Sequence, residues 1–115
     1  MSYTLDEVEL MLTLYPIAKI HLNEIEITKQ IHNGEKLSKY EKHSKDYYSF
    51  VICIVDYWLN YLFPDEVEII KLRVFNKLTF DYISIQLGYS NHSSIVRKYK
   101  SILNKISQLE VECHE

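Results

Sequence analysis

Apolar side chains recur at helical spacing along most of the chain, and short polar breaks divide the pattern into separate segments. Such spacing predicts amphipathic helices rather than strands. The first segment begins at Thr4, where Thr4 and Glu7 form a capping box that satisfies free backbone amides. Pro16 then interrupts the pattern, and it fits either the first turn of a new helix or a kink within a continuous one.

The second segment spans residues 17–32 and ends at Asn33-Gly34, which is a typical C-terminal stop signal. Its apolar stripe consists of Ile17, Ile20, Ile27 and Ile31. The stretch over residues 35–46, EKLSKYEKHSKD, is polar and rich in lysine. It predicts an exposed linker that acts as a hinge between the N-terminal helices and the rest of the chain.

The third segment runs from Lys45 to Leu62, with Ser44 as its cap, and is apolar on nearly every face. A helix of that kind is buried centrally or shared with a partner. Residues 50–55, FVICIV, are rich in β-branched side chains, so a strand is the alternative there. The length of the pattern and the aspartates on either side favour a helix, which Phe63-Pro64 ends.

After Pro64 the pattern changes to three short helices joined by two short turns. Acidic residues occupy the first turn of the first of these helices, where the helix dipole favours them. Thr79 caps the second helix, Gly88 ends it, and Ser90 caps the third. The inward face of the third helix consists of Ile95, Tyr99, Ile102, Leu103 and Ile106.

Three helices joined in this way are typical of a helix-turn-helix unit. Ser84 supplies a small side chain where the second and third helices cross, and Gly88 reverses the chain in the left-handed conformation. The outer face of the third helix is polar and basic, which suits contact with phosphates and with base edges in the major groove. The side chains that we expect to contact DNA are Thr79, Ser90, Asn91, His92, Ser93, Ser94, Arg97, Lys98, Ser101 and Lys105.

Residues 66–106 resemble the helix-turn-helix of sigma-70 region 4. The resemblance rests on Leu72-Arg73, on Thr79 at the start of the scaffold helix, on Ile83-Ser84 and on LGYS at residues 87–90. With its helical N-terminal half, the whole chain is similar to the phage-encoded late transcriptional regulators of the RinA/ArpU type. That resemblance implies binding to a phage promoter and activation of late genes through RNA polymerase.

The spacing after the glycine turn departs from the sigma pattern. The stretch between Ser90 and Ile95 is one residue longer than in typical sigma region 4, and residues 88–100 are similar to the GYSxxSxxxRxxK motif of AraC-type proteins. An added residue shifts which side chain faces which base. The resemblance therefore implies the roles of cap, turn and basic outer face, and not individual base contacts.

The distribution of charge also points to the C-terminal part. Residues 1–63 hold nine acidic and six basic side chains, whereas residues 64–109 hold four acidic and seven basic ones. A local basic surface is what nucleic-acid binding requires, even in a chain with a net charge of −3. We therefore predict an all-α protein with an N-terminal helical region (1–63), a helix-turn-helix region (64–109) and a polar tail (110–115).

Aromatic side chains are abundant, with ten tyrosines, four phenylalanines and one tryptophan. Such residues are enriched at protein–protein interfaces, and a homodimer fits DNA binding at paired half-sites. The residues that we expect at the dimer interface are Tyr47, Phe50, Ile54, Tyr57, Trp58 and Tyr61. The alternative function is a protein-interaction module whose helix-turn-helix binds RNA polymerase or another phage regulator, and not DNA.

The sequence argues against several other classes of protein. Cys113-His114 has no companion pair at ligand spacing, so we expect no metal site and no cofactor. We expect no enzyme, because the sequence has no nucleophile–base arrangement or phosphate loop. The longest apolar run is too short to cross a bilayer, and the first ten residues lack a signal-peptide core. Two cysteines do not make a disulfide framework, and we expect a cytoplasmic protein.

Overall fold

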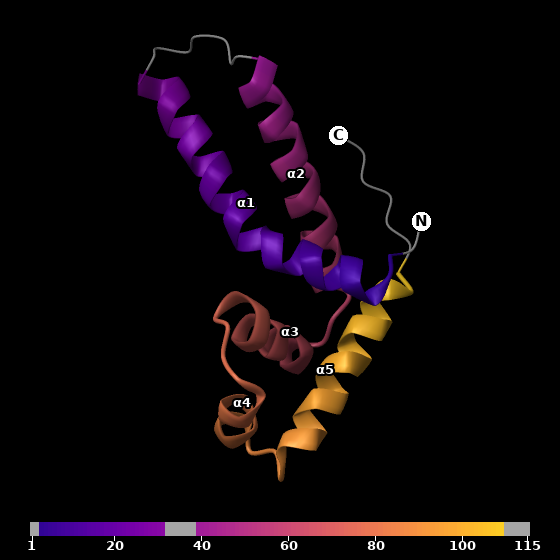
Figure 1. The fold of residues 1–115 in the computed structure, drawn as a ribbon. Coiled ribbons are helices and arrows are strands. Elements are labelled where there is room, and N and C mark those ends of the chain that lie inside the picture. The colour runs from indigo at the N-terminus through magenta and orange to yellow at the C-terminus, as the bar shows by residue number, and fades with distance from the viewer. Residues whose placement is uncertain (1–2, 32–38, 110–115) are drawn as a thin grey trace.

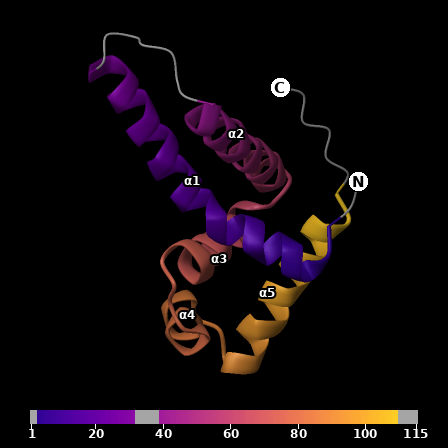
Figure 2. The same ribbon diagram turned by 45° about the horizontal axis from the view of Figure 1, so that its top comes forward.

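The computed structural model describes residues 3–31 and 39–109, except for the side chains of residues 39 and 40. Helices are the only regular secondary structure in these residues, which confirms the predicted all-α class. In chain order they are α1 (Leu5–Ile31), α2 (Lys39–Asn60), α3 (Pro64–Ile70), the π-helical segment η1 (Lys71–Phe75), α4 (Phe80–Leu87) and α5 (His92–Ser107). The helices α1 and α2 form an antiparallel hairpin that projects from the group formed by α3, α4 and α5 (Figures 1 and 2).

The first helix, α1, is continuous, and Pro16 lies inside it. The predicted capping box at its start is present: the amide of Thr4 donates to Oε1 of Glu7 at 3.1 Å, and the amide of Glu7 donates to Oγ1 of Thr4 at 3.2 Å. A proline within a helix removes one backbone hydrogen bond and bends the helix. The ribbon of α1 changes direction part of the way along its length in both views (Figures 1 and 2).

The second helix, α2, begins at Lys39, well before the predicted start at Lys45. Ser44 therefore lies inside the helix and is not its cap, and the predicted linker is wrong from residue 39 onward. Lysine and glutamate are good helix formers, which explains the earlier start. Just after this segment α2 contacts α1: the ring of His21 stacks on that of Tyr48, with 4.9 Å between centroids. The remaining part of the predicted linker, and the stop signal at Asn33-Gly34, lie outside the described residues.

Residues 50–55 are helical, so the helix was the correct alternative for FVICIV. Cys53 in this segment is disulfide-bonded, although two cysteines were not expected to make a disulfide framework; Cys113 lies outside the described residues. None of the described helices combines the length and the apolar composition needed to span a bilayer.

A single hydrophobic core runs through the hairpin and the C-terminal helices. Leu12 of α1, Trp58 of α2 and Ile102 of α5 all have side chains that are fully buried. The helix α5 contacts α1, α3 and α4, so it is the element that joins the two parts. The five residues predicted to face inward on α5 are all buried, which leaves its opposite face for other roles.

Candidate nucleic-acid interface

The turn between α4 and α5 is built around Gly88, which adopts the left-handed conformation with φ of 79°. The amide of Tyr89 donates to the carbonyl of Ser84 at 2.8 Å, and the amide of Gly88 donates to that of Ile85 at 3.4 Å. These two bonds satisfy carbonyls that the end of α4 would otherwise leave free. A Cβ atom added to Gly88 meets nothing within 4 Å. Glycine is therefore needed here for the backbone conformation and not for space.

Two side chains that the sequence analysis named, Thr79 and Ser84, form hydrogen bonds to the backbone of α4. Oγ1 of Thr79 accepts a hydrogen bond from the amide of Tyr82 at 3.2 Å, so Thr79 is the predicted cap of α4. Ser84 is 5% exposed, and its hydroxyl donates to the carbonyl of Asp81 at 2.8 Å. The small side chain expected at this point is therefore buried and has its hydrogen-bond partner within α4.

The cap of α5 is Asn91, and not Ser90 as predicted. Oδ1 of Asn91 accepts hydrogen bonds from the amide of Ser94 at 2.9 Å and from its hydroxyl at 3.1 Å. Ser90 is exposed and precedes the cap. Asparagine and serine are about equally good caps. Which of these two neighbours caps α5 therefore depends on the residue at which the turn after Gly88 ends and the helix begins.

His92, at the first position of α5, contacts the scaffold helix. Its Nδ1 lies 2.7 Å from Oδ1 of Asp81, and its ring meets Phe80 edge-on, with 5.8 Å between centroids. Both members of the polar pair are largely exposed. His92, one of the predicted DNA contacts, thus joins the start of α5 to the first turn of α4.

Two of the predicted DNA contacts are lysines that turn toward α3. Nζ of Lys105 lies 2.8 Å from Oε1 of Glu66 and 4.3 Å from the centre of the Phe63 ring. Nζ of Lys98 lies 3.6 Å from Oδ2 of Asp65. The sequence grouped both lysines with the outer face of α5, because it did not show how closely the acidic first turn of α3 approaches that helix.

Glu66 is the buried acid of this corner, with 7% of its surface exposed. Its Oε1 also accepts from the amide of Phe63 at 2.8 Å and so stabilises the start of α3. Burial acts to raise the pKa of the Glu66 carboxyl, but the hydrogen bonds from Lys105 and Phe63, and the charges of Lys105 and Lys98, outweigh it and leave the pKa lowered. The Glu66 carboxyl is therefore ionised near neutral pH, and its contact with Lys105 joins α3 to α5.

The outer face of α5 opposite the core carries a different set of side chains from the one predicted. Those that are exposed on it are Ser93, Arg97, Lys100, Ser101 and Asn104. Within the described residues neither Arg97 nor Lys100 forms an ion pair with a carboxylate. Asn104 was not among the predicted residues, although its position seven residues after Arg97 places it on the same face of a helix. Ser94, which was predicted, is half-buried and bonded to the cap.

The six residues predicted for a dimer interface divide between surface and core. Ile54 and Trp58 are 2% and 0% exposed and fill the core of the chain itself, so they do not lie on the surface of α2. Tyr47, Phe50 and Tyr61 are exposed. Tyr57 is half-buried, with its ring 4.9 Å from that of Tyr61.

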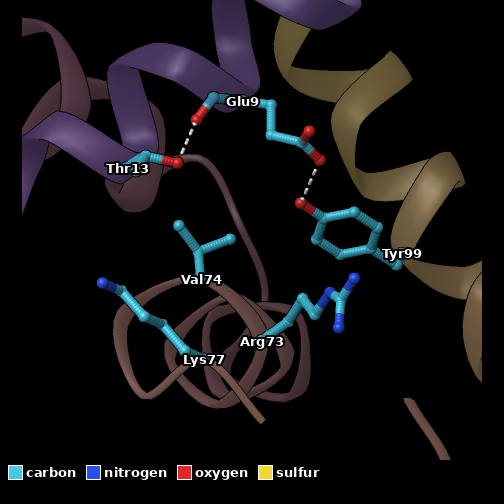
Figure 3. Close-up of a pocket in the computed structure, with 6 residues that line it drawn as sticks. All are labelled: Glu9, Thr13, Arg73, Val74, Lys77 and Tyr99. Carbon is cyan, nitrogen blue, oxygen red and sulfur yellow. Dashed lines mark hydrogen bonds between the residues drawn. The ribbon is translucent and has the colours of Figure 1, made fainter. Parts of the chain in front are cut away.

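A pocket of about 330 Å³ lies where α1, η1 and α5 meet (Figure 3). Glu9 and Tyr99 point toward each other across it, and the Tyr99 hydroxyl donates to Oε2 of Glu9 at 2.7 Å. Burial, with the hydrogen bond to Glu9, raises the pKa of Tyr99 far above its ordinary value. Arg73 lies 3.9 Å from the centre of the Phe80 ring and donates to the carbonyl of Leu78 at 3.1 Å. The bond between Tyr99 and Glu9 therefore joins α5 to α1, whereas the contacts of Arg73 lie within the C-terminal part.

The side chains of the described residues include no group of three histidines, cysteines or acids able to hold a metal ion. The chain matches no protein-family model, no curated protein and no solved structure.

Proposed function

We propose that this chain binds double-stranded DNA through α5 and regulates transcription. The observation that carries the proposal is the exposed outer face of α5, which combines Arg97, Lys100 and Asn104 with two serines. The sequence of this helix contains no acidic residue. An arginine binds guanine through two hydrogen bonds, an asparagine binds adenine in the same way, and a lysine contacts phosphate.

In this proposal α4, the Gly88 turn and α5 form the helix-turn-helix. The helix α5 lies in the major groove, and α4 crosses the DNA backbone. Thr79 and Asn91 cap the two helices, and the free amides beside these caps offer donors to phosphates. The pair of His92 with Asp81 fixes the start of α5 against α4, which keeps the reading face in a constant orientation.

The resemblance to sigma-70 region 4 and to phage late regulators of the RinA/ArpU type extends the proposal. It supports a cytoplasmic activator that binds a phage promoter and contacts RNA polymerase. The supporting sequence features are LGYS at residues 87–90, the capping Thr79 and the helical N-terminal half.

The test begins with selection from a pool of random DNA duplexes by the full chain. Binding to the selected duplex is then measured across salt concentration, for the wild type and for Arg97→Ala and Lys100→Ala. We expect affinity to fall steeply with salt, and each variant to weaken binding by about 5- to 50-fold. A lost phosphate contact reduces the salt slope by about one.

The matched control is Lys42→Ala, which removes an exposed lysine from α2 and is expected to leave both affinity and slope unchanged. Failure to select any duplex, or binding that does not respond to salt, would overturn the proposal. Equal loss in Lys42→Ala and Arg97→Ala would show general charge attraction instead of an interface on α5.

A protein-interaction module is the second candidate, and one observation favours it. Ile85 on α4 is 80% exposed and Tyr82 is 54% exposed, so the scaffold helix shows apolar side chains to solvent. This function predicts that RNA polymerase or another phage regulator is retained by the chain in the absence of DNA, and that Ile85→Lys abolishes this retention. Under the DNA-binding proposal, Ile85→Lys does not weaken duplex binding, because α4 crosses the DNA backbone and an added lysine there is attracted to phosphates.

A further inference from the structure

The helix α1 carries a second apolar stripe, here called the outer stripe. Its members are Leu10, Ile17, Ile20, Ile27 and Ile31. They are between 43% and 69% exposed, whereas the stripe of α1 that contains Val8, Leu12 and Ala18 is completely buried. Apolar side chains exposed along a whole helix are unusual in a monomer and mark a contact surface.

Helix geometry explains why the hairpin leaves the outer stripe uncovered. With 3.6 residues per turn, the outer stripe lies about half a turn around α1 from the stripe of Val8, Leu12 and Ala18. The buried stripe faces α2 and the core. A helix that packs on one face of α1 cannot reach the other.

The spacing of the outer stripe is that of a coiled-coil seam. Steps of seven, three, seven and four residues separate its five members, and these steps place them at the a and d positions of a heptad repeat. Thr13 and Glu24 occupy the two remaining a and d positions. The seam is about 30 Å long at 1.5 Å per residue. It is interrupted by these two polar side chains and by the bend at Pro16, which lies between Leu10 and Ile17.

We propose that the outer stripe binds α1 of a second copy of this chain, in antiparallel orientation. One register pairs every a position with a d position of the partner. It places Leu10 against Ile27 of the partner subunit and Ile17 against Ile20 of the partner subunit. Around the two-fold axis each contact occurs twice, so the dimer buries all four of these side chains from both copies.

The polar residues of the seam select a second copy in this orientation. A parallel pair would set Glu24 against Glu24 of the partner subunit, and like charges that face each other are unfavourable. The antiparallel register sets Glu24 against the neutral Thr13 of the partner subunit, which is exposed and whose hydroxyl donates to the carbonyl of Glu9 in its own helix at 2.8 Å. Beside the seam, Glu7 meets the neutral Thr28 of the partner subunit. The four central apolar side chains thus meet apolar ones and Glu24 meets an uncharged side chain, whereas Ile31 lies at the end of the seam, opposite Asp6 of the partner subunit.

This dimer differs from the one predicted on the aromatic residues of α2, since Ile54 and Trp58 are core residues. It is independent of the proposed DNA binding, because it concerns α1 alone. Failure of either proposal leaves the other in place, since mass in solution and duplex affinity are measured separately.

The first test is sedimentation equilibrium of the full chain, with a non-reducing gel to exclude a disulfide-linked dimer. We expect a reversible dimer, and a dissociation constant about 100-fold or more higher in Ile20→Lys, because two charges enter the seam near its axis. The matched control is Ile85→Lys, which changes an exposed isoleucine on α4 and leaves the constant unchanged. Circular dichroism shows that both variants are folded.

The second test determines the register with two double variants at the same positions. In Leu10→Lys/Ile27→Glu, the antiparallel register brings each lysine opposite a glutamate, so a salt-sensitive dimer is expected. In Leu10→Lys/Ile27→Lys, lysines face one another and the chain is expected to be monomeric. A parallel seam gives like charges in both variants and dimerises in neither.

Three outcomes would overturn the inference. The first is a wild type that stays monomeric at all concentrations. The second is a dimer that persists in Ile20→Lys and is lost in Phe50→Lys. The third is identical behaviour of the two double variants.

Discussion

The hairpin and the C-terminal helices use the same kind of sequence pattern in different ways. In α5 every residue of the apolar stripe is buried in the chain's own core. In α1 one stripe is buried and the other, with Ile20 and Ile31, is exposed. Periodicity reports that a helix has an apolar face, but it does not report what covers that face. A short helix between three neighbours has its partners nearby, whereas a long helix that projects from the body does not.

The largest expected effect separates these two kinds of stripe directly. Ile102→Ala in α5 removes a fully buried side chain and is expected to lower the free energy of unfolding by about 2–5 kcal/mol. Ile31→Ala removes a side chain that is 69% exposed and is expected to change it by less than about 0.5 kcal/mol. Urea unfolding in dilute solution, where the chain is monomeric, measures both. Equal losses would mean that the outer stripe is covered within the monomer.

The next effect concerns the buried ion pair that fixes α5 to α3. Lys105→Ala leaves the carboxylate of Glu66 buried without its partner, so we expect a loss of about 1–3 kcal/mol of unfolding free energy at neutral pH. Lys98→Ala is the matched control, because its pair with Asp65 is exposed to solvent and such pairs contribute about 0–1 kcal/mol. A larger loss in Lys98→Ala would reverse the assignment of these two lysines.

The same pair makes the stability depend on acid. The pKa of Glu66 is lowered in the folded chain, so its contribution is fully present above the ordinary value of 4.5 and is lost as pH falls through the lowered pKa. Glu66→Gln therefore flattens the fall in unfolding free energy below about pH 4.5 relative to the wild type. Chemical denaturation at successive pH values measures this slope, and an unchanged slope would contradict the lowered pKa.

How much the sequence could predict follows from the range of the contacts involved. The capping box of Thr4 and the turn at Gly88 depend on residues close in the chain, and both were predicted correctly. The partners of Lys98 and Lys105 were missed, because Asp65 and Glu66 lie more than thirty residues away. The start of α2 was missed because its lysine-rich first turns resemble a loop in composition, although lysine and glutamate are also good helix formers. For α5 the apolar face was predictable and the set of free basic side chains was not.

Replacement of Gly88 in the turn after α4 is expected to lower the free energy of unfolding only moderately, because the glycine is needed for its backbone conformation and not for space. Gly88→Ala places a Cβ in the left-handed region at a cost of about 1–2 kcal/mol, with no added steric clash, since no atom lies within 4 Å of that Cβ. Gly88→Asn is expected to cost less, because asparagine adopts this conformation more readily. Thermal unfolding measures both. A loss well above this range in Gly88→Ala would indicate a close contact at the turn.

The smallest effect decides between the two candidate caps of α5. Asn91→Ala removes the acceptor for the amide of Ser94 and is expected to cost about 1 kcal/mol of unfolding free energy. Ser90→Ala changes an exposed residue before the cap and is expected to cost a few tenths of a kcal/mol at most. Asn91→Asp keeps the acceptor and is expected to retain most of the stability. Denaturant unfolding of the three variants gives the order. A larger loss of unfolding free energy in Ser90→Ala than in Asn91→Ala would mean that Ser90 is the cap. The helix would then start one residue earlier, and the side chains at the beginning of α5 would face DNA differently.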